Sequence, residues 1–371
     1  MEFTDRLFSE IEQKQWDIDG FLEKLKEKKV VIWGTGLAGN MILDALTRLQ
    51  IPISFFADNN RQKRGMSIHG KTVLGIDQIP GEAFIIIAAN VKYGIHEQLC
   101  GASITDYKYI DPIWLYSYKE NDVFSSLKSN KDSIDEVYNM LTDEDSKKVY
   151  RNILLHRAVH DIHLVWEVYD EHQYFGNPIV RNADGNFVDC GAFQGDTLSC
   201  FLEQIREGTD YKYYAFEADP QNYEVLRSFC EERNLYNVKP INLGVWDRHT
   251  HLSFKENQAT GEVSGKIIEE NDASSETIEV NSLDAVLDNA KVDFIKMDIE
   301  GAEIKALQGA RNCIQTNLPT LAISAYHELE HLWKVPLLIK TIDKDYDIYF
   351  GHHMWNMADT VCYGLYKSER I

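Results

Sequence analysis

The sequence predicts an α/β protein with two domains, each built on a doubly wound, mostly parallel sheet, joined by a helical connector. Three observations predict this fold. Two glycine loops each follow a short apolar run, a charged stretch with helical spacing separates them, and apolar runs alternate with helical stretches toward the C-terminus. Such alternation is typical of parallel sheets with helical crossovers. We place the three parts at residues 1–115, 116–180 and 181–371.

Composition and charge exclude several classes of protein. With 371 residues, 44% of them hydrophobic and 26% charged, the chain is typical of a globular protein. A net charge of −21 without a basic stripe argues against nucleic-acid binding. The longest apolar run, 83–89, is too short for a membrane span, and the first residues lack a secretory pattern. Six scattered cysteines indicate reduced thiols and a cytoplasmic location.

The first domain reads as alternating strands and helices. We expect, in order, a strand at 29–33, a helix at 40–49, and strands at 53–56 and 84–88. The strands are short apolar runs, and the helix carries apolar residues at three- and four-residue steps.

A dinucleotide-type fingerprint follows the first strand. Gly34, Gly36 and Gly39 open the helix, and Asp58 lies 19 residues past the third glycine, where a ribose-binding acid is expected. The residues 33–36, 56–59 and 68–73 look like the small Rossmann-like domain that heads several sugar-modifying enzymes, including nucleotide-sugar acetyltransferases. This resemblance implies a second nucleotide-type site, for a nucleotide-sugar or another phosphate-bearing ligand. NAD binding and a purely structural or dimerising role are the alternatives.

The connector reads as helices at 133–141 and 143–169, with a capping box formed by Ser133 and Glu136. His156, His160 and His163 could share one helix face, but they stand among apolar residues without an obvious fourth ligand. We therefore expect a structural connector that packs on the region after it.

The third region carries seven candidate strands. They lie at 186–189, 212–216, 238–242, 292–297, 320–324, 347–350 and 360–366. A short loop joins the last two, so the final strand is expected to return antiparallel. Residues 249–254 and 277–280 read as an inserted hairpin.

A second glycine loop ends the first strand of this region. Asp189, Gly191 and Gly195 are followed by Asp196 and Thr197, either of which can cap the next helix. Glu217 ends the second strand, where an acid can accept hydrogen bonds from ribose hydroxyls. The loop lacks a third glycine for a pyrophosphate, which favours a nucleoside without phosphates and with a cationic neighbour. S-adenosylmethionine has this chemistry.

Four motifs in the third region carry a family resemblance. They are Asp189-x-Gly191-Ala192-x-x-Gly195-Asp196-Thr197, Phe216-Glu217-x-Asp219-Pro220, Asn242-x-Gly244-Val245-Trp246, and the run 296–303 with its Asp-x-Glu-Gly-x-Glu pattern. In this order they resemble the FkbM family of S-adenosylmethionine-dependent methyltransferases. The resemblance covers about residues 185–366. It implies a class I methyltransferase fold with a seven-stranded, mostly parallel sheet, and O-methylation of a sugar or another hydroxyl-bearing metabolite.

The resemblance also implies roles for individual residues. Asp189, Gly191 and Gly195 would line the methionine end of the cofactor, and Ala192 and Thr197 belong to the same loop. The remaining cofactor positions are Glu217 at the ribose with Ala218 beside it, Gly244 and Val245 near the adenine, and Asp298 facing the reacting centre. Asp189 and Glu217 are expected to cradle the sulfur-bearing cation together.

Methylation of an alcohol needs a base that removes its proton. The candidates are Asp298, Glu300, His327, His352 and His353. We favour His327, which follows the fifth strand, because the resembled family carries a similar Tyr-His pair there and His suits proton transfer near neutral pH. A histidine that is hydrogen-bonded for structure is the alternative. Asp298 and Glu300 would orient the acceptor, whereas Glu303 reads as helix surface. We expect no resident metal, although an ion held by Asp298 with His327 and His331 is a weaker alternative.

The sequence therefore predicts an S-adenosylmethionine-dependent methyltransferase that acts on a sugar or nucleotide-linked sugar hydroxyl. An NAD-dependent oxidoreductase of a nucleotide sugar and a non-catalytic nucleotide-sugar-binding protein are the alternatives. The expected partner is a small-molecule or glycan acceptor, and a homo-oligomer is compatible with the sequence.

Overall fold

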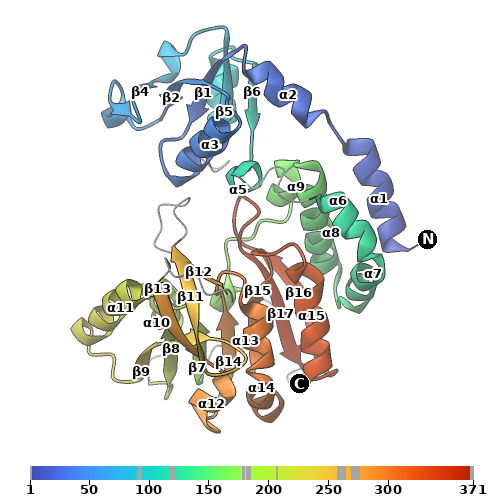
Figure 1. Cartoon of the computed structure of the whole chain (residues 1–371), viewed down its shortest axis with the longest axis vertical. Coiled ribbons are helices and arrows are strands. Elements are labelled where there is room, and N and C mark those ends of the chain that lie inside the picture. The colour runs from blue at the N-terminus through green and yellow to red at the C-terminus, as the bar shows by residue number, and fades with distance from the viewer. Residues whose placement is uncertain are drawn as a thin grey trace.

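Figure 1 shows the computed structural model of the chain, which describes residues 2–89, 94–116, 122–177, 180, 185–205, 208–256, 265–268 and 276–367. The expected α/β class is confirmed by the alternation of strands and helices along the chain. Among the described residues, no helix is both long enough and apolar enough to cross a membrane.

The first sheet has six strands in the order β3-β4-β2-β1-β5-β6. Their bounds are β1 (Lys29–Trp33), β2 (Ile53–Ala57), β3 (Ser67–Ile68), β4 (Lys71–Leu74), β5 (Ala83–Ile87) and β6 (Tyr107–Tyr109). The pairs of β1, β2, β4, β5 and β6 are parallel, whereas β3 returns antiparallel against β4. The helical elements are α2 (Ile18–Leu25), α3 (Leu37–Arg48), η1 (Arg61–Lys63), η2 (Ile76–Gln78) and α4 (Ile95–Gly101).

Alternate residues of β1 bury opposite faces of this sheet. Val30 and Ile32 pack in one cluster with α2 and α3, and Val31 and Trp33 pack in another with α4. This period of two is what a strand covered on both sides requires.

Helices α5 (Pro112–Tyr116), α6 (Val123–Ser129), α7 (Lys131–Met140), α8 (Glu144–Val159) and α9 (Ile162–Trp166), with η4 (Tyr174–Gly176), form the connector. The first helix, α1 (Phe3–Lys14), lies against them: Phe3 stacks on Tyr138 with ring centroids 3.8 Å apart, and Thr4 donates to Asp135. The bounds of the three parts remain a prediction. Helix α1 lies within the expected range of the first domain but packs against the connector helices.

Two expectations for the connector are wrong. Helix α7 begins at Lys131 with Asn130 at its N-cap, so Ser133 lies inside the helix rather than in a capping box. The expected helix 143–169 is two helices, because His160 ends α8 in the left-handed region at φ 57° and Asp161 caps α9.

The large sheet has seven strands in the order β16-β17-β15-β14-β7-β8-β9. Their bounds are β7 (Phe187–Cys190), β8 (Tyr213–Glu217), β9 (Val238–Asn242), β14 (Phe294–Met297), β15 (Thr320–Ser324), β16 (Tyr346–His352) and β17 (Thr360–Tyr366). The pairs among the first five of these are parallel, and β17 runs antiparallel to both β15 and β16.

Helices α10 (Asp196–Gln204), α11 (Pro220–Glu232), α12 (Leu283–Leu287), α13 (Glu303–Gln308), α14 (Arg311–Asn317) and α15 (His331–Ile342) accompany this sheet. Phe187 and Phe294 bury one face together with α10 and α11, while Ile295 and Met297 bury the other with α13, α14 and α15. The connector helices belong to this second core. Parallel strands end at one edge of a sheet, so loops distant in sequence meet there.

A smaller sheet with the order β10-β13-β11-β12 lies beside the large one (Figure 1). Its strands are β10 (Gly244–Val245), β11 (Thr250–Glu256), β12 (Gly265–Ile268) and β13 (Glu276–Asn281). The antiparallel pair of β11 and β13 confirms the expected hairpin strands.

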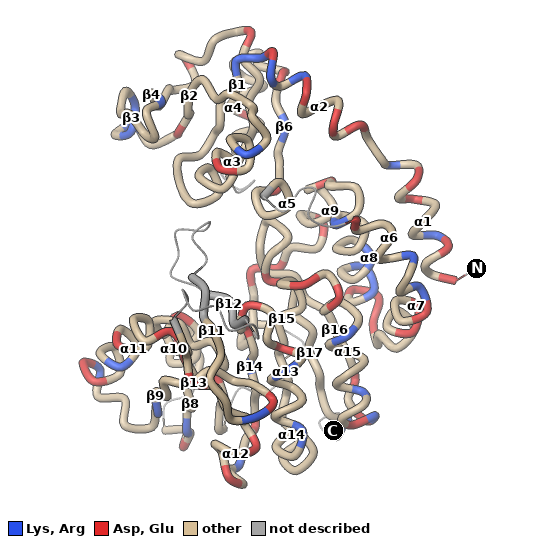
Figure 2. The backbone as a smooth tube through the Cα atoms, in the orientation of Figure 1, with Lys and Arg blue, Asp and Glu red and all other residues tan. Residues whose placement is uncertain are grey.

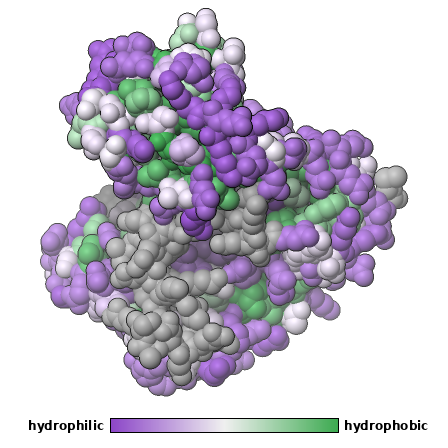
Figure 3. Space-filling view, turned by 45° about the horizontal axis from the view of Figure 1, so that its top comes forward, coloured by the Kyte–Doolittle hydropathy of each residue, from purple (hydrophilic) through white to green (hydrophobic). Residues whose placement is uncertain are grey.

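Charge is distributed over the whole chain. Figure 2 shows Lys and Arg interspersed with Asp and Glu along the described backbone. Figure 3 shows that hydrophilic residues cover much of the displayed face, with smaller apolar areas on the first domain.

Candidate active site

Most of the expected site residues meet at the edge of the large sheet where β7, β8, β14 and β15 end. Gly191 directly follows β7, Glu217 is the last residue of β8, and Asp298 directly follows β14. His327 lies three residues after β15. The sheet order places β14 between β7 and β15, so these four chain segments are neighbours.

The glycine loop requires glycine for two reasons. Gly191 has φ 80°, and a Cβ built on it would lie 1.9 Å from the carbonyl oxygen of Asp298. Gly195 has φ 96° and occupies the N-cap of α10 without a side-chain cap. The expectation that Asp196 or Thr197 caps this helix is therefore wrong. Thr197 and Ala192 are buried, so their side chains support the loop.

Asp189 makes its contacts inside the protein. Its side chain is fully buried, its Oδ1 lies 2.9 Å from Nζ of Lys296, and its Oδ2 accepts a 2.6 Å hydrogen bond from Tyr213. Lys296 also donates to the carbonyl of Gly191 at 2.6 Å. Burial works to lower the pKa of Lys296, but Asp189 and Asp298 outweigh it and raise this pKa. Asp189 therefore balances a buried cation and fixes the loop, and its expected pairing with Glu217 around a bound cation stays a prediction.

Lys296 is a residue that sequence reasoning passed over. Its signal was present, because a lysine within the buried run Phe294–Met297 requires an anionic partner.

Glu217 has the position expected of a ribose-binding acid. Its Oε2 accepts from the N–H of Phe193 and its Oε1 from the N–H of Asp219, both at 2.8 Å. Each carboxylate oxygen keeps a second acceptor position. Burial raises the pKa of Glu217 to about 7, although these two hydrogen bonds oppose the shift.

An apolar surface lies next to Glu217. Ala218 and Ile299 are partly buried and pack against a cluster that contains Trp246. Gly244 and Val245 are buried in β10, and Val245 belongs to the main core. The side chain of Val245 therefore serves packing, so the backbone of β10 is what could face a base.

The loop after β14 carries Asp298, Glu300 and Gly301. Glu300 and Gly301 have φ 55° and 100°, so the chain turns sharply here. Glu303 closes the turn, because its Oε1 accepts a 3.0 Å hydrogen bond from the N–H of Ile299. Asp298 keeps about a quarter of its side chain exposed.

Glu303 and His327 form a buried dyad. Glu303 is fully buried, and its Oε1 lies 2.8 Å from Nδ1 of His327, while its Oε2 lies 3.2 Å from Nδ1 of His331. Burial works to raise the pKa of Glu303, but the two histidines hold it well below its usual range. The expectation that Glu303 is helix surface is wrong, since sequence spacing does not reveal what a helix face meets.

The second nitrogen of His327 points at two carboxylates. Its Nε2 lies 3.4 Å from Oδ1 of Asp298 and 3.8 Å from Oε2 of Glu300, and it has no hydrogen-bond partner among the described residues. Burial works to lower the pKa of His327, but Glu303, Asp298 and Glu300 outweigh it and raise this pKa to about 9. The three catalytic candidates are thus brought together.

The structure adds Tyr326 and Asp359 to this site. Tyr326 donates a 3.1 Å hydrogen bond to Asp298. Asp359 lies in the left-handed region at φ 55° and interacts electrostatically with Asp298 and His327. Burial, with the charge of Asp298, raises the pKa of Asp359 to about 7. The hydroxyl of Tyr174 is buried without a hydrogen-bond partner among the described residues. Asp359 gave no sequence signal, because only the β16–β17 loop brings it here.

The other two candidate bases make hydrogen bonds within the protein, although Nε2 of His352 has no hydrogen-bond partner among the described residues. Nδ1 of His352 lies 2.9 Å from the hydroxyl of Thr360, and Nε2 of His353 lies 2.9 Å from the hydroxyl of Tyr363. Burial lowers the pKa of His352 to about 3 and also lowers that of His353. Both side chains are buried, so they read as structural.

The connector histidines have separate partners. His156 contacts Asp111, His160 stacks on Trp114, and His163 packs against Trp166. Within the described part of the chain, donor atoms of Asp298, Glu303 and His327 lie within 4.8 Å of one another, as an ion would require. Because Nδ1 of His327 and Glu303 already engage each other, we interpret this set as a hydrogen-bonded dyad.

The first glycine loop is held together by its own side chains. Asp58 accepts hydrogen bonds from Thr35, from Lys63 at 3.1 Å and from the N–H of Asn60 at 2.8 Å. A Cβ on Gly39 would lie 2.0 Å from the carbonyl oxygen of Gly34, whereas Gly36 faces open space. The second nucleotide-type site remains a prediction, and a ribose would have to replace contacts that Asp58 makes.

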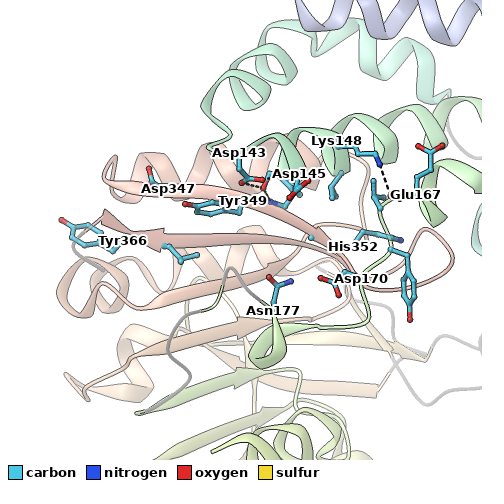
Figure 4. A pocket seen from close by; sticks show the side chains of 17 residues that line it. Asp143, Asp145, Lys148, Glu167, Asp170, Asn177, Asp347, Tyr349, His352 and Tyr366 are labelled. Atoms are coloured by element: carbon cyan, nitrogen blue, oxygen red, sulfur yellow. Dashed lines mark hydrogen bonds between the residues drawn. The ribbon is translucent and has the colours of Figure 1, made fainter. Parts of the chain in front are cut away.

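A pocket of about 730 Å³ lies elsewhere, between the start of α8 and strands β16 and β17 (Figure 4). Its lining is acidic, with Asp143, Asp145, Glu167, Asp170 and Asp347 against Lys148. None of the expected cofactor residues lines it.

The fold and the strand-end geometry define an α/β domain with a buried acid–histidine dyad at the end of its parallel strands. Residues 189–355, which include Asp189, Glu217, Asp298 and the Glu303–His327 dyad, match the family described as the methyltransferase FkbM domain. This segment is therefore similar to FkbM methyltransferase domains. Residues 26–110 match a second family, described as C2185-like, N-terminal. No curated protein matches the chain.

One solved structure has a similar fold over most of the chain. A crystal structure of methyltransferase FkbM from Methylobacillus flagellatus KT is 21% identical and superposes with a TM-score of 0.70 over 91% of this chain and 90% of that one. The likeness shows a shared fold across both domains.

Two more distant structures match about half of this chain. Aeropyrum pernix fibrillarin with bound S-adenosyl-L-methionine has a TM-score of 0.31 and 13% identity over 52% of this chain and 71% of that one. SMU.1697c, a methyltransferase from Streptococcus mutans in complex with SAH, has a TM-score of 0.30 and 14% identity over 55% and 94%.

Proposed function

We propose that this protein is an S-adenosylmethionine-dependent methyltransferase that methylates a hydroxyl oxygen of a sugar or nucleotide-linked sugar. One observation carries the proposal: the glycine loop, Glu217, Asp298 and the Glu303–His327 dyad converge where four strands end. The match of residues 189–355 to the FkbM domain supports methyl transfer.

The residues present fit the cofactor. Glu217 keeps acceptor positions for two ribose hydroxyls, and Ala218 and Ile299 offer an apolar surface beside it. Asp298 and Glu300 present negative charge that favours a cation. When bound, S-adenosylmethionine supplies a methyl group activated by positive sulfur.

His327 is the proposed base. Glu303 orients the imidazole through Nδ1, which leaves Nε2 to accept the proton of an acceptor hydroxyl. With its pKa at about 9, His327 is mostly protonated at neutral pH, so it must first lose a proton. Methyl transfer should therefore speed up as pH rises toward 9.

Calorimetry with S-adenosylhomocysteine, NAD, UDP-glucose and GDP-mannose, each alone, tests the proposal. We expect S-adenosylhomocysteine to bind and Glu217→Ala to weaken that binding. Absence of S-adenosylhomocysteine binding by folded protein would contradict the proposed function. Binding of NAD alone would point to the oxidoreductase, and binding of a nucleotide sugar alone to a non-catalytic binding protein.

Transfer itself is measured with methyl-labelled S-adenosylmethionine and the two nucleotide sugars as acceptors. Label in the sugar would support the acceptor class, and His327→Asn should slow the transfer by about 100-fold. A sugar that stays unlabelled while S-adenosylhomocysteine binds would remove the acceptor assignment and leave the cofactor assignment standing.

A further inference from the structure

One buried cation of the connector reaches the active-site loop. Arg157, near the end of α8, is 9% exposed, and its Nη2 donates a 2.6 Å hydrogen bond to the carbonyl oxygen of Tyr326. Tyr326 directly precedes His327. The bond joins residues 169 positions apart, across the boundary between connector and methyltransferase domain.

The last turn of α8 is anchored through the residue next to Arg157. The neighbouring His156 is buried, and its Nε2 lies 3.2 Å from Oδ2 of Asp111, while its Nδ1 lies 3.0 Å from the carbonyl oxygen of Asp161. Oδ2 of Asp111 also accepts a 2.7 Å hydrogen bond from the N–H of Met357, in the loop that carries Asp359. Both loops that bear active-site groups are thus tied to the last turn of α8.

Burying an arginine is costly without a function for its charge. Burial lowers the pKa of Arg157 to about 10, so it stays charged at neutral pH. Its Nε has no hydrogen-bond partner among the described residues, whereas its Nη2 donates to the carbonyl oxygen of Tyr326. Packing alone would be met by an apolar side chain of similar length.

We propose that Arg157 is a positioning residue that holds the Tyr326–His327 segment in register with Glu303 and Asp298. The bond fixes the carbonyl between two site residues: Tyr326 bonds Asp298 on one side, and His327 contacts Glu303 on the other. Without it, Nδ1 of His327 would no longer be held 2.8 Å from Glu303. The proposal rests on the proposed function for its catalytic meaning, but its geometry can be tested separately.

The test compares Arg157→Met, Arg157→Lys and a matched control, Arg151→Met, in the full chain. Arg151 lies on the same helix but pairs with Glu10 near the surface. The readout is the titration of His327, observed by NMR of labelled imidazole and assigned with His327→Asn. The groups that face His327 are Glu303, Asp298, Glu300 and Asp359, and none of them is altered.

We expect Arg157→Met to lower the pKa of His327 by about one unit, a tenfold change in its protonation equilibrium. Arg157→Lys, which keeps a charged donor, should restore most of the wild-type value, and Arg151→Met should leave it unchanged. The affinity for S-adenosylhomocysteine should stay within about twofold in all three, because Arg157 does not contact the cofactor residues.

A wild-type His327 titration in Arg157→Met would overturn the proposal, as would equal shifts in the methionine and lysine variants. If Arg157→Met does not fold, Arg157→Lys is compared with Arg151→Met instead. A folded Arg157→Lys protein with wild-type kinetics of label transfer and a wild-type titration of His327 would support the proposal. Loss of S-adenosylhomocysteine binding by the wild type would instead count against the proposed function alone.

Discussion

At the scale of single residues, the site depends on buried charges whose partners set their protonation. Glu217 and His327 have raised pKa values for opposite reasons: burial penalises the anion of Glu217, whereas carboxylates stabilise the cation of His327. The raised pKa of Glu217 predicts a pH-dependent ligand affinity, and that of His327 predicts a pH-dependent stability.

Binding of S-adenosylhomocysteine should weaken as pH falls below about 7. Ribose hydroxyls donate to a carboxylate, so the ligand prefers ionised Glu217, whose pKa is about 7 in the free protein. Calorimetry between pH 5.5 and 8.5 measures this, and Glu217→Gln should bind about tenfold more weakly with a flat pH dependence. Glu224→Gln, at an exposed position of the same helix–strand unit, is the control. A pH-dependent affinity that survives in Glu217→Gln would contradict the assignment.

The stabilising effect of His327 should disappear in alkali. Its folded pKa of about 9 exceeds the ordinary 6.5, so its contribution is fully present below about pH 6.5 and is lost as pH rises through 9. Urea unfolding of the wild type and His327→Asn should therefore differ by a few kcal/mol at pH 6 and converge near pH 10. His249→Asn, at an exposed histidine, should track the wild type throughout. A constant difference across this range would show that His327 acts by packing rather than by charge.

At the scale of elements, the two glycine loops differ although their patterns look alike. In the second loop, Gly191 faces the carbonyl of Asp298 at the edge where the strands end. Lys296, in β14, donates a hydrogen bond to the carbonyl oxygen of Gly191. In the first loop, a Cβ on Gly34 or Gly39 would also collide with backbone, at 2.7 Å and 2.0 Å, whereas Gly36 faces open space at the N-cap of α3. Sequence spacing could find both loops but could not tell which glycine tolerates a side chain, because that depends on which backbone atoms lie opposite it.

Alanine substitutions at Gly191 and at Gly36 should differ in their cost to the stability of the protein. Gly191→Ala should destabilise the protein by about 2 kcal/mol or more, because φ 80° disfavours a side chain and the added Cβ would collide with backbone. Gly36→Ala should cost less than about 1 kcal/mol, since the added Cβ meets nothing within 4 Å. Chemical denaturation measures both. Equal costs would mean that the loop after β14 can move away from Gly191.

At the scale of the whole molecule, the first domain and the methyltransferase domain share a junction. Met357, from the β16–β17 loop, is 6% exposed and packs within the first domain's core beside Trp114 and Leu115. Asp111 ties the same loop to α8. The loop that carries Asp359 is thus anchored outside its own sheet.

Met357→Ala should destabilise the chain by about 2–4 kcal/mol, because it leaves a cavity at this junction. Met66→Ala is the control, since Met66 is 52% exposed and its loss should change stability by less than about 0.5 kcal/mol. Urea unfolding measures both variants. Similar midpoints for the two would show that the junction does not depend on Met357.

The sequence by itself determined the α/β class, the seven strands of the large sheet, and the place of Glu217, Asp298 and His327 at or after strand ends, because short apolar runs and glycine turns are local signals. It did not reveal the short strands β3, β4, β6, β10 and β12. Tertiary structure alone decided that Asp189 neutralises Lys296, that Glu303 is buried behind His327, and that Arg157 and Asp359 reach the site. The physical reason is that a buried charge is defined by its partner, and these partners come from strands and helices far apart in the chain.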